Sequence, residues 1–109
     1  MRIWDINPQL LCRNHLLGEH RELHAIWSIL TQQKKGYRNH PETIRWKGHL
    51  KALYLRHEQL VAEMRKRGYQ HQSPLDVSLA SGESIQKIFV DSLEKQIELL
   101  HKKQCGCKV

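Results

Sequence analysis

The sequence predicts an all-α fold, a compact single domain of about three helices with irregular loops. Three observations favour this class. Apolar side chains recur at helical spacing in three segments, no segment keeps the alternation typical of a strand, and turn-forming residues gather between the segments. A chain of 109 residues is long enough to bury one modest core, so we expect residues 1–109 to form one domain.

The first predicted helix begins at Asn7, which suits an N-cap, with Pro8 at the first helical position. It ends before Gly36. Its apolar stripe consists of Leu16, Leu23, Ile26, Trp27 and Leu30. This stripe predicts one face turned toward the core, with Trp27 on it.

The second predicted helix begins near His40 and Pro41 and ends at Arg65-Lys66-Arg67. Cations in the last turn suit the helix dipole, and Gly68 suits the position just after the end. Its apolar stripe consists of Leu50, Leu53, Tyr54, His57, Leu60, Val61 and Met64.

The third predicted helix follows Ser81-Gly82-Glu83. Its apolar side consists of Ile85, Ile88, Phe89, Leu93, Ile97 and Leu100. We expect residues 100–109, which include three lysines and two cysteines, to form a flexible tail.

The positive charge is concentrated in one third of the chain. The net charge of +7 comes entirely from residues 34–67, which hold ten basic and three acidic side chains, while the flanking parts are balanced. A polyanion would be attracted to this part of the chain, although a basic face can also serve solubility alone. We expect duplex DNA to be bound through cations of the loop and the second helix. These are Lys34, Lys35, Arg38, Arg45, Lys47, Lys66 and Arg67.

Composition excludes several classes of protein. No run approaches the roughly 20 apolar residues that span a bilayer, and the N-terminus has no apolar stretch of the signal-peptide type. The chain has three cysteines, an odd number that disfavours a secreted disulfide scaffold. We therefore expect a monomeric protein of the reducing cytoplasm that does not bind a membrane.

The cysteines at the C-terminus raise the question of a metal site. Cys105 and Cys107, together with Cys12 and His101, supply suitable donor atoms, but their spacing matches no standard zinc pattern. We expect a reduced, exposed tail, and neither a metal nor a cofactor.

Glu22 and His15 share one face of the first predicted helix. Residues seven apart differ by only about 20° around a helix, and Gly18 lies between them. Glycine inside a helix costs about 1 kcal/mol against alanine, which raises the question of a close approach at this position. Either this face is a polar notch with a chemical role, or Gly18 only lets another helix pack closely.

Two stretches are similar to a known family. Residues 15–23, HLLGEHREL, resemble the signature of the pyrimidine-dimer DNA glycosylase/AP lyase family, the phage-type endonuclease V that acts on UV-damaged DNA. Residues 60–69, LVAEMRKRGY, resemble the end of that family's middle helix. The order and spacing of the two stretches fit, and the likeness covers roughly residues 1–72.

The resemblance implies a reaction in which the chain's own α-amine is the nucleophile. The amine attacks C1′ of the damaged nucleotide, expels the base and forms a Schiff base, and β-elimination then cuts the strand. Aligned without gaps, Met1 stands at the nucleophilic position, and the bulk of Arg2 normally prevents its removal. Glu22 corresponds to the essential carboxylate.

The resemblance also implies DNA contacts and leaves the lesion open. Arg2, His15 and Arg21 match basic residues that bind DNA near the lesion. Ala25 stands in place of a family arginine, and the C-terminal aromatic cluster is absent. Pyrimidine dimers, other damaged bases and abasic sites are all candidate substrates. A non-catalytic helical module that binds nucleic acid is the alternative, and a protein-interaction domain is a third interpretation.

Overall fold

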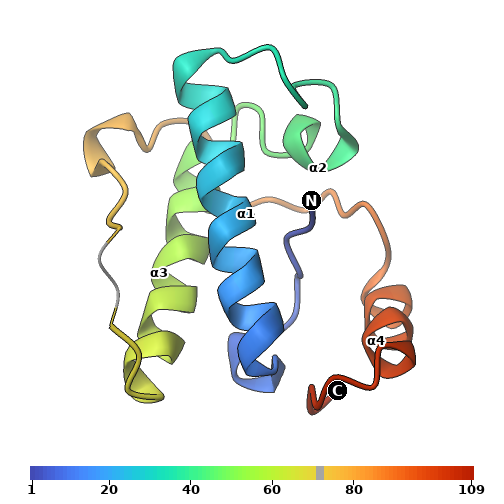
Figure 1. Ribbon diagram of the computed structural model, residues 1–109. Coiled ribbons are helices and arrows are strands. Elements are labelled where there is room, and N and C mark those ends of the chain that lie inside the picture. The colour runs from blue at the N-terminus through green and yellow to red at the C-terminus, as the bar shows by residue number, and fades with distance from the viewer. Residues whose placement is uncertain (71–72) are drawn as a thin grey trace.

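Two long helices, α1 (Arg13–Gln32) and α3 (Leu50–Lys66), form the centre of the fold and run antiparallel against each other (Figure 1). The computed structural model describes residues 1–70 and 73–109. Shorter elements surround the helical pair: η1 (Pro8–Leu10), α2 (Pro41–Ile44), η2 (Val77–Leu79) and α4 (Leu93–Lys102). The described residues contain no strand, and the predicted all-α class is confirmed.

The first residues of the chain run down one side of α1, and the chain turns at η1 and returns upward as α1 (Figure 1). Asn7 is an N-cap as predicted, since its Oδ1 accepts a hydrogen bond from the Gln9 N–H at 3.0 Å. It caps the short η1, however, and α1 begins only at Arg13. The prediction of one continuous helix from Asn7 is therefore wrong.

The break between η1 and α1 is stabilised by Arg67. Leu11 and Cys12 are extended, with ψ of 140° and 168°. The Arg67 guanidinium donates to the main-chain oxygens of Pro8 at 3.2 Å and Leu11 at 2.7 Å. Those carbonyls thus have partners without a continuing helix.

The second predicted helix is divided in two. His40 caps α2 by accepting from the Glu42 N–H at 3.0 Å, and residues 45–49 separate α2 from α3. Trp46 lies in the core with its indole N–H donating to Glu42 at 3.1 Å. The predicted end is confirmed, because α3 ends at Lys66 and Gly68 has a φ of +85°.

The third predicted helix is much shorter than expected. Residues 81–83 instead bond to the start of α3: the N–H groups of Lys51 and Ala52 donate to Ser81 at 2.8 Å and Glu83 at 3.1 Å. This satisfies donors that a helix N-terminus leaves free. Gly82 is required there, because a Cβ on it would lie 2.2 Å from the Gly48 oxygen. The helix begins only after Ser92, whose hydroxyl accepts from the Lys95 N–H at 3.1 Å.

The hydrophobic core lies between α1, α3 and the N-terminal segment. All three tryptophans, Trp4, Trp27 and Trp46, are buried in it, so Trp46 is a core residue and not a platform for base stacking. In contrast, Ile85 and Ile88 are about two-thirds exposed, at 65% and 64%. The apolar side predicted for the third helix therefore fails before α4.

Three buried side chains hold the backbone of residues 3–5, and we call them the N-terminal anchor: Glu19, Arg45 and Gln96. The Trp4 N–H donates to Glu19 at 3.0 Å, and the Asp5 N–H donates to Gln96 at 2.8 Å. The Ile3 carbonyl accepts from Arg45 at 3.0 Å. Because these side chains come from α1, the end of α2 and α4, the N-terminal segment is fixed against three elements at once.

The C-terminal residues pack against the rest of the molecule. Leu100 is buried in the core, and the Lys108 N–H donates to the Leu10 oxygen at 2.7 Å. Flexibility of residues 100–109 stays a prediction. No helix among the described residues is long and apolar enough to cross a membrane.

The anchor predicts that Arg45 is essential for stability. Arg45 is 4% exposed and bonds Glu42, Asp5 and two main-chain carbonyls. Arg45→Met leaves those partners unpaired, and removal of one partner of a buried ion pair costs about 3–5 kcal/mol. We expect a drop of this size in the free energy of unfolding, measured with urea.

The matched control is Lys47→Met, which removes an exposed cation two positions away. Its free energy of unfolding should change little. Equal stability of the two variants would contradict the role of Arg45 in the anchor.

Candidate active site

An open cleft of about 650 Å³ lies where the N-terminus meets the middle of α1 and the loop that follows it. Met1 and Glu22 both line this cleft, and Lys34 and Tyr37 reach it from the loop. The structure therefore brings together the two residues for which the sequence predicts a catalytic role, together with one predicted DNA-binding lysine.

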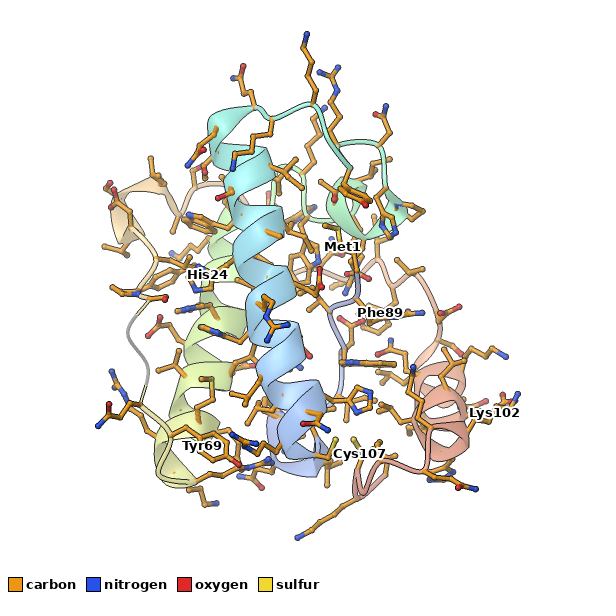
Figure 2. The ribbon with its side chains drawn as sticks, in the orientation of Figure 1. Met1, His24, Tyr69, Phe89, Lys102 and Cys107 are labelled. Atoms are coloured by element: carbon orange, nitrogen blue, oxygen red, sulfur yellow. The ribbon has the colours of Figure 1, made fainter. Side chains whose placement is uncertain are left out.

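Met1 is held at the cleft by the segment behind it and by its own side chain. The N-terminal anchor fixes residues 3–5, and the Met1 sulfur accepts a hydrogen bond from the buried Thr43 hydroxyl at 3.4 Å. Figure 2 shows Met1 beside α1, close to α2. The first residue is thus positioned rather than loose.

Glu22 reaches the cleft because of its position on α1. The N-terminal segment runs antiparallel to α1, so residues that precede Trp4 lie beside residues that follow Glu19 (Figure 1). Glu22 comes one turn after Glu19 and is half-buried. Its neighbour Arg21 is exposed and does not line the cleft.

The buried Glu19 is a site residue that the sequence prediction missed. Burial raises the pKa of the Glu19 carboxyl, and the Arg56 guanidinium opposes this by pairing with both carboxylate oxygens, at 2.7 and 3.0 Å. The sequence indicates that Glu19 is buried, because it lies between Leu16 and Leu23 at helical spacing on the core side of the helix. Glu19 positions the backbone, whereas Glu22 faces the cleft.

Arg45 is not available to DNA, which corrects its assignment as a DNA-binding residue. Its side chain is 2% exposed and is paired with Glu42 at 2.5 Å and Asp5 at 3.0 Å. The distribution of charge along the sequence cannot distinguish such a cation from an exposed one. Arg67 is likewise engaged, since it bonds Glu63 at 2.9 Å besides the carbonyls near η1.

Arg2 is paired with an acid of the segment before α4. Its guanidinium lies 2.8 Å from Asp91, with both side chains partly exposed, and 5.1 Å from the centre of the Trp4 ring. A phosphate would have to compete with Asp91 for this cation.

The remaining predicted cations lie at two ends of the helical pair. Lys34, Lys35 and Arg38 are exposed in the loop after α1, and Lys47 is exposed before α3. Lys66 is at the other end of α3, where it lines a second cleft of about 560 Å³ between η1 and α3. Because α1 spans about 30 Å, the structure does not gather all these residues around Met1.

His15 lies away from the cleft, so the structure does not bring it together with Glu22. Its Nδ1 is 3.1 Å from the Cys12 sulfur and 3.5 Å from the Cys107 sulfur. Burial, and then the nearby Lys103 ammonium, lowers the pKa of His15. A neutral imidazole is a weaker phosphate ligand than an imidazolium.

Two groups of possible metal ligands occur among the described residues. One consists of Cys12, His15, Cys105 and Cys107. The other consists of His20, His24 and His57, with the Nε2 atoms of His24 and His57 3.2 Å apart. The sequence indicates the three cysteines but pairs them with His101, because nothing in it shows that the chain end returns to α1.

A family model described as pyrimidine dimer DNA glycosylase matches residues 1–77. The chain belongs to this family. Neither curated proteins nor solved structures give a significant match. The resemblance found in the sequence is confirmed, and membership of a DNA glycosylase family implies a DNA substrate.

The match to the family covers the N-terminal part of the chain and not the C-terminal part. It includes Met1, the whole of α1 and α3, and the loop between them. It excludes α4 and the cysteines at the C-terminus. The cleft therefore lies wholly within the part of the chain that matches the family.

Gly18 lies on α1 one turn before Glu22 and provides a test of the packing around this helix. A Cβ on Gly18 would meet nothing within 4 Å, so no other helix needs this glycine for close packing. Gly18→Ala should raise the free energy of unfolding by about 0.5–1 kcal/mol, because alanine is the better helix former. Urea unfolding measures this, and a clear decrease in stability would contradict the open space that the structure shows there.

Proposed function

We propose that this protein removes damaged bases from duplex DNA and cuts the strand at the resulting abasic site, with the α-amine of Met1 as nucleophile and Glu22 as the assisting carboxylate. The observation that carries this proposal is that Met1 and Glu22 line one cleft although they lie on different segments. Membership of the pyrimidine dimer DNA glycosylase family supports it.

The α-amine suits nucleophilic attack at neutral pH. An α-amine ordinarily has a pKa of about 7.7–8.0, well below that of a lysine side chain. The neutral form of an α-amine has a lone pair that can form the bond to C1′ as the bond to the base breaks. The sugar ring then opens to give the Schiff base between C1′ and the amine. β-Elimination breaks the strand on the 3′ side of this sugar.

Glu22 supplies negative charge where positive charge develops. Departure of the base gives the sugar oxocarbenium character, which a carboxylate in the cleft stabilises. The same group can then move the protons that Schiff-base formation and elimination require. These roles need a carboxylate near the amine, and the lining of one cleft by both Met1 and Glu22 supports that arrangement.

DNA binding is proposed for the loop that follows α1. Lys34 lines the cleft, and Lys35 and Arg38 are exposed in the same loop. Enzymes that act at C1′ reach it by turning a nucleotide out of the duplex. Cations beside the cleft would hold the phosphates that flank such a nucleotide.

The first test traps the proposed Schiff base. Borohydride should reduce the imine between Met1 and abasic-site DNA to a stable covalent adduct, located on Met1 by mass spectrometry. A chain extended at its N-terminus, which displaces the amine from the cleft, should give none. Tight, salt-sensitive DNA binding without any adduct on the native start would favour a non-catalytic nucleic-acid module.

The second test addresses the carboxylate. Glu22→Gln keeps the shape of the side chain but removes its charge, so base release should fall by about 100-fold or more while DNA affinity stays nearly unchanged. Base release from damaged duplexes and equilibrium binding are measured side by side. Glu94→Gln, which neutralises an exposed carboxylate on α4, is the matched control, and equal activity of the two variants would contradict the proposal.

The third test addresses the loop. Replacement of Lys34, Lys35 and Arg38 by Gln removes up to three cations that neutralise phosphates. The slope of log affinity against log salt should flatten by about 0.9 for each phosphate that is no longer neutralised, and for all sequences alike. Lys102→Gln, at the exposed end of α4, is the control. An unchanged slope in the loop variant would place the DNA elsewhere.

A further inference from the structure

We propose that Cys12, His15, Cys105 and Cys107 bind one zinc ion, which fastens the C-terminal end of the chain to the start of α1. This site is separate from the cleft of the proposed glycosylase reaction, and Cys105 and Cys107 lie outside the residues that match the family.

The donor atoms are already arranged at the spacing of a metal site. All four lie within 4.8 Å of one another. The Cys105 and Cys107 sulfurs are 3.4 Å apart, and the His15 Nδ1 lies 3.1 Å from Cys12 and 3.5 Å from Cys107. In a tetrahedral zinc site, usual bond lengths give about 3.8 Å between two sulfurs and about 3.6 Å between sulfur and nitrogen. Small shifts of the side chains would admit the ion.

Both halves of the site are held by regular local structure. Cys12 is the N-cap of α1 and His15 follows it within the first turn, so a two-residue spacer separates the two ligands. Gly106 has a φ of +90°, which lets the chain turn between Cys105 and Cys107. The two halves come from opposite ends of the chain, since Cys12 and Cys107 are 95 positions apart.

Hydrogen bonds hold the two halves together around the donor atoms. The Cys12 N–H donates to the Cys107 sulfur at 3.1 Å, and the Lys108 N–H donates to the Leu10 oxygen at 2.7 Å. Figure 2 shows Cys107 and neighbouring sulfur atoms at the lower end of α1. An N–H to a sulfur is also the usual support of a metal thiolate.

The donor set selects for zinc. Three sulfurs and one imidazole nitrogen in a tetrahedral arrangement form a closed structural zinc site, with no position left for water or substrate. Binding requires three thiols to lose their protons, so the occupied site carries a net charge of −1. The Lys103 ammonium, which lies close enough to His15 to interact electrostatically, would balance part of that charge.

The proposed ion would strengthen the connection between the chain end and the start of α1, which two hydrogen bonds already make. In the segment before α4, Ile85 and Ile88 are largely exposed. The helix α4 itself contributes few fully buried apolar side chains. A metal that joins the start of α1 to the chain end would stabilise α4 against the core, and with it Gln96 of the N-terminal anchor. Assignment of His15 to zinc also removes it from the DNA contacts implied by the resemblance.

Cobalt binding to the full-length, reduced chain tests the site. Co²⁺ occupies tetrahedral zinc sites and absorbs light through sulfur-to-metal charge transfer, which a site made of histidines alone does not show. We expect one Co²⁺ per chain with strong charge-transfer and tetrahedral bands, both displaced by Zn²⁺. Zinc should also raise the melting temperature, because the ion binds only the folded state.

The variants separate this site from the group of histidines. Removal even of a residue that only supports a ligand costs about 10–100-fold in metal affinity, so Cys107→Ser and Cys105→Ser should each weaken cobalt binding at least tenfold. His20→Ala, which removes a member of the other group, should retain the charge-transfer bands. Circular dichroism of each metal-free variant checks that the helices remain.

Several results would overturn the proposal. These are no cobalt binding, binding without sulfur-to-metal bands, binding that survives Cys107→Ser, and binding abolished only by His20→Ala. Closure of two of the three thiols into a disulfide in air, without metal binding by the reduced chain, would assign the group to redox chemistry instead. None of these results depends on glycosylase activity.

Discussion

The position of the first residue depends on how the backbone of residues 3–5 is bonded. A chain terminus is ordinarily the least constrained part of a domain, which is a poor place for a nucleophile. Here Glu19, Arg45 and Gln96 supply hydrogen-bond partners to three consecutive residues. Buried charged and polar groups are costly unless they are paired, so each of these side chains disfavours any other path of the N-terminal segment. Met1 is carried to the cleft as a result.

The antiparallel course of this segment explains why two carboxylates one turn apart lie in different surroundings. An extended chain advances about 3.3 Å per residue and a helix about 1.5 Å. With the Trp4 N–H held by Glu19, the residues before Trp4 extend past the next turn of α1, where Glu22 lies. The Glu19 carboxylate points inward and is bonded to the segment, whereas Glu22 lies at the cleft.

The sequence predicts the long helices well because periodic apolar side chains report the core directly. The apolar stripe that includes Leu23 lies on α1, and the stripe that includes Leu60 lies on α3. The end predicted at Gly68 agrees with the end of α3. The breaks were not predictable, because they depend on contacts between distant residues, such as Arg67 with the carbonyls near η1. The same limit applies to the site. Family motifs identify Met1 and Glu22, but they do not show that Arg45 is buried or that His15 faces two cysteines.

The way in which α4 and the segment before it pack against the core gives a physical reason for a cross-link at the C-terminus. Small domains bury a limited share of the surface that the unfolded chain exposes, so a bound metal that joins two distant segments can add to their stability. In this chain the segment before α4 exposes Ile85 and Ile88, yet α4 must stay in place for Gln96 to reach Asp5. Of the apolar side chains of α4, Leu100 is fully buried, and Ile97 and Leu99 are partly buried against the core. A zinc ion held by three cysteines and a histidine beyond the C-terminal end of α4 would add a further restraint, so the proposed zinc ion and the position of Met1 are linked through one helix.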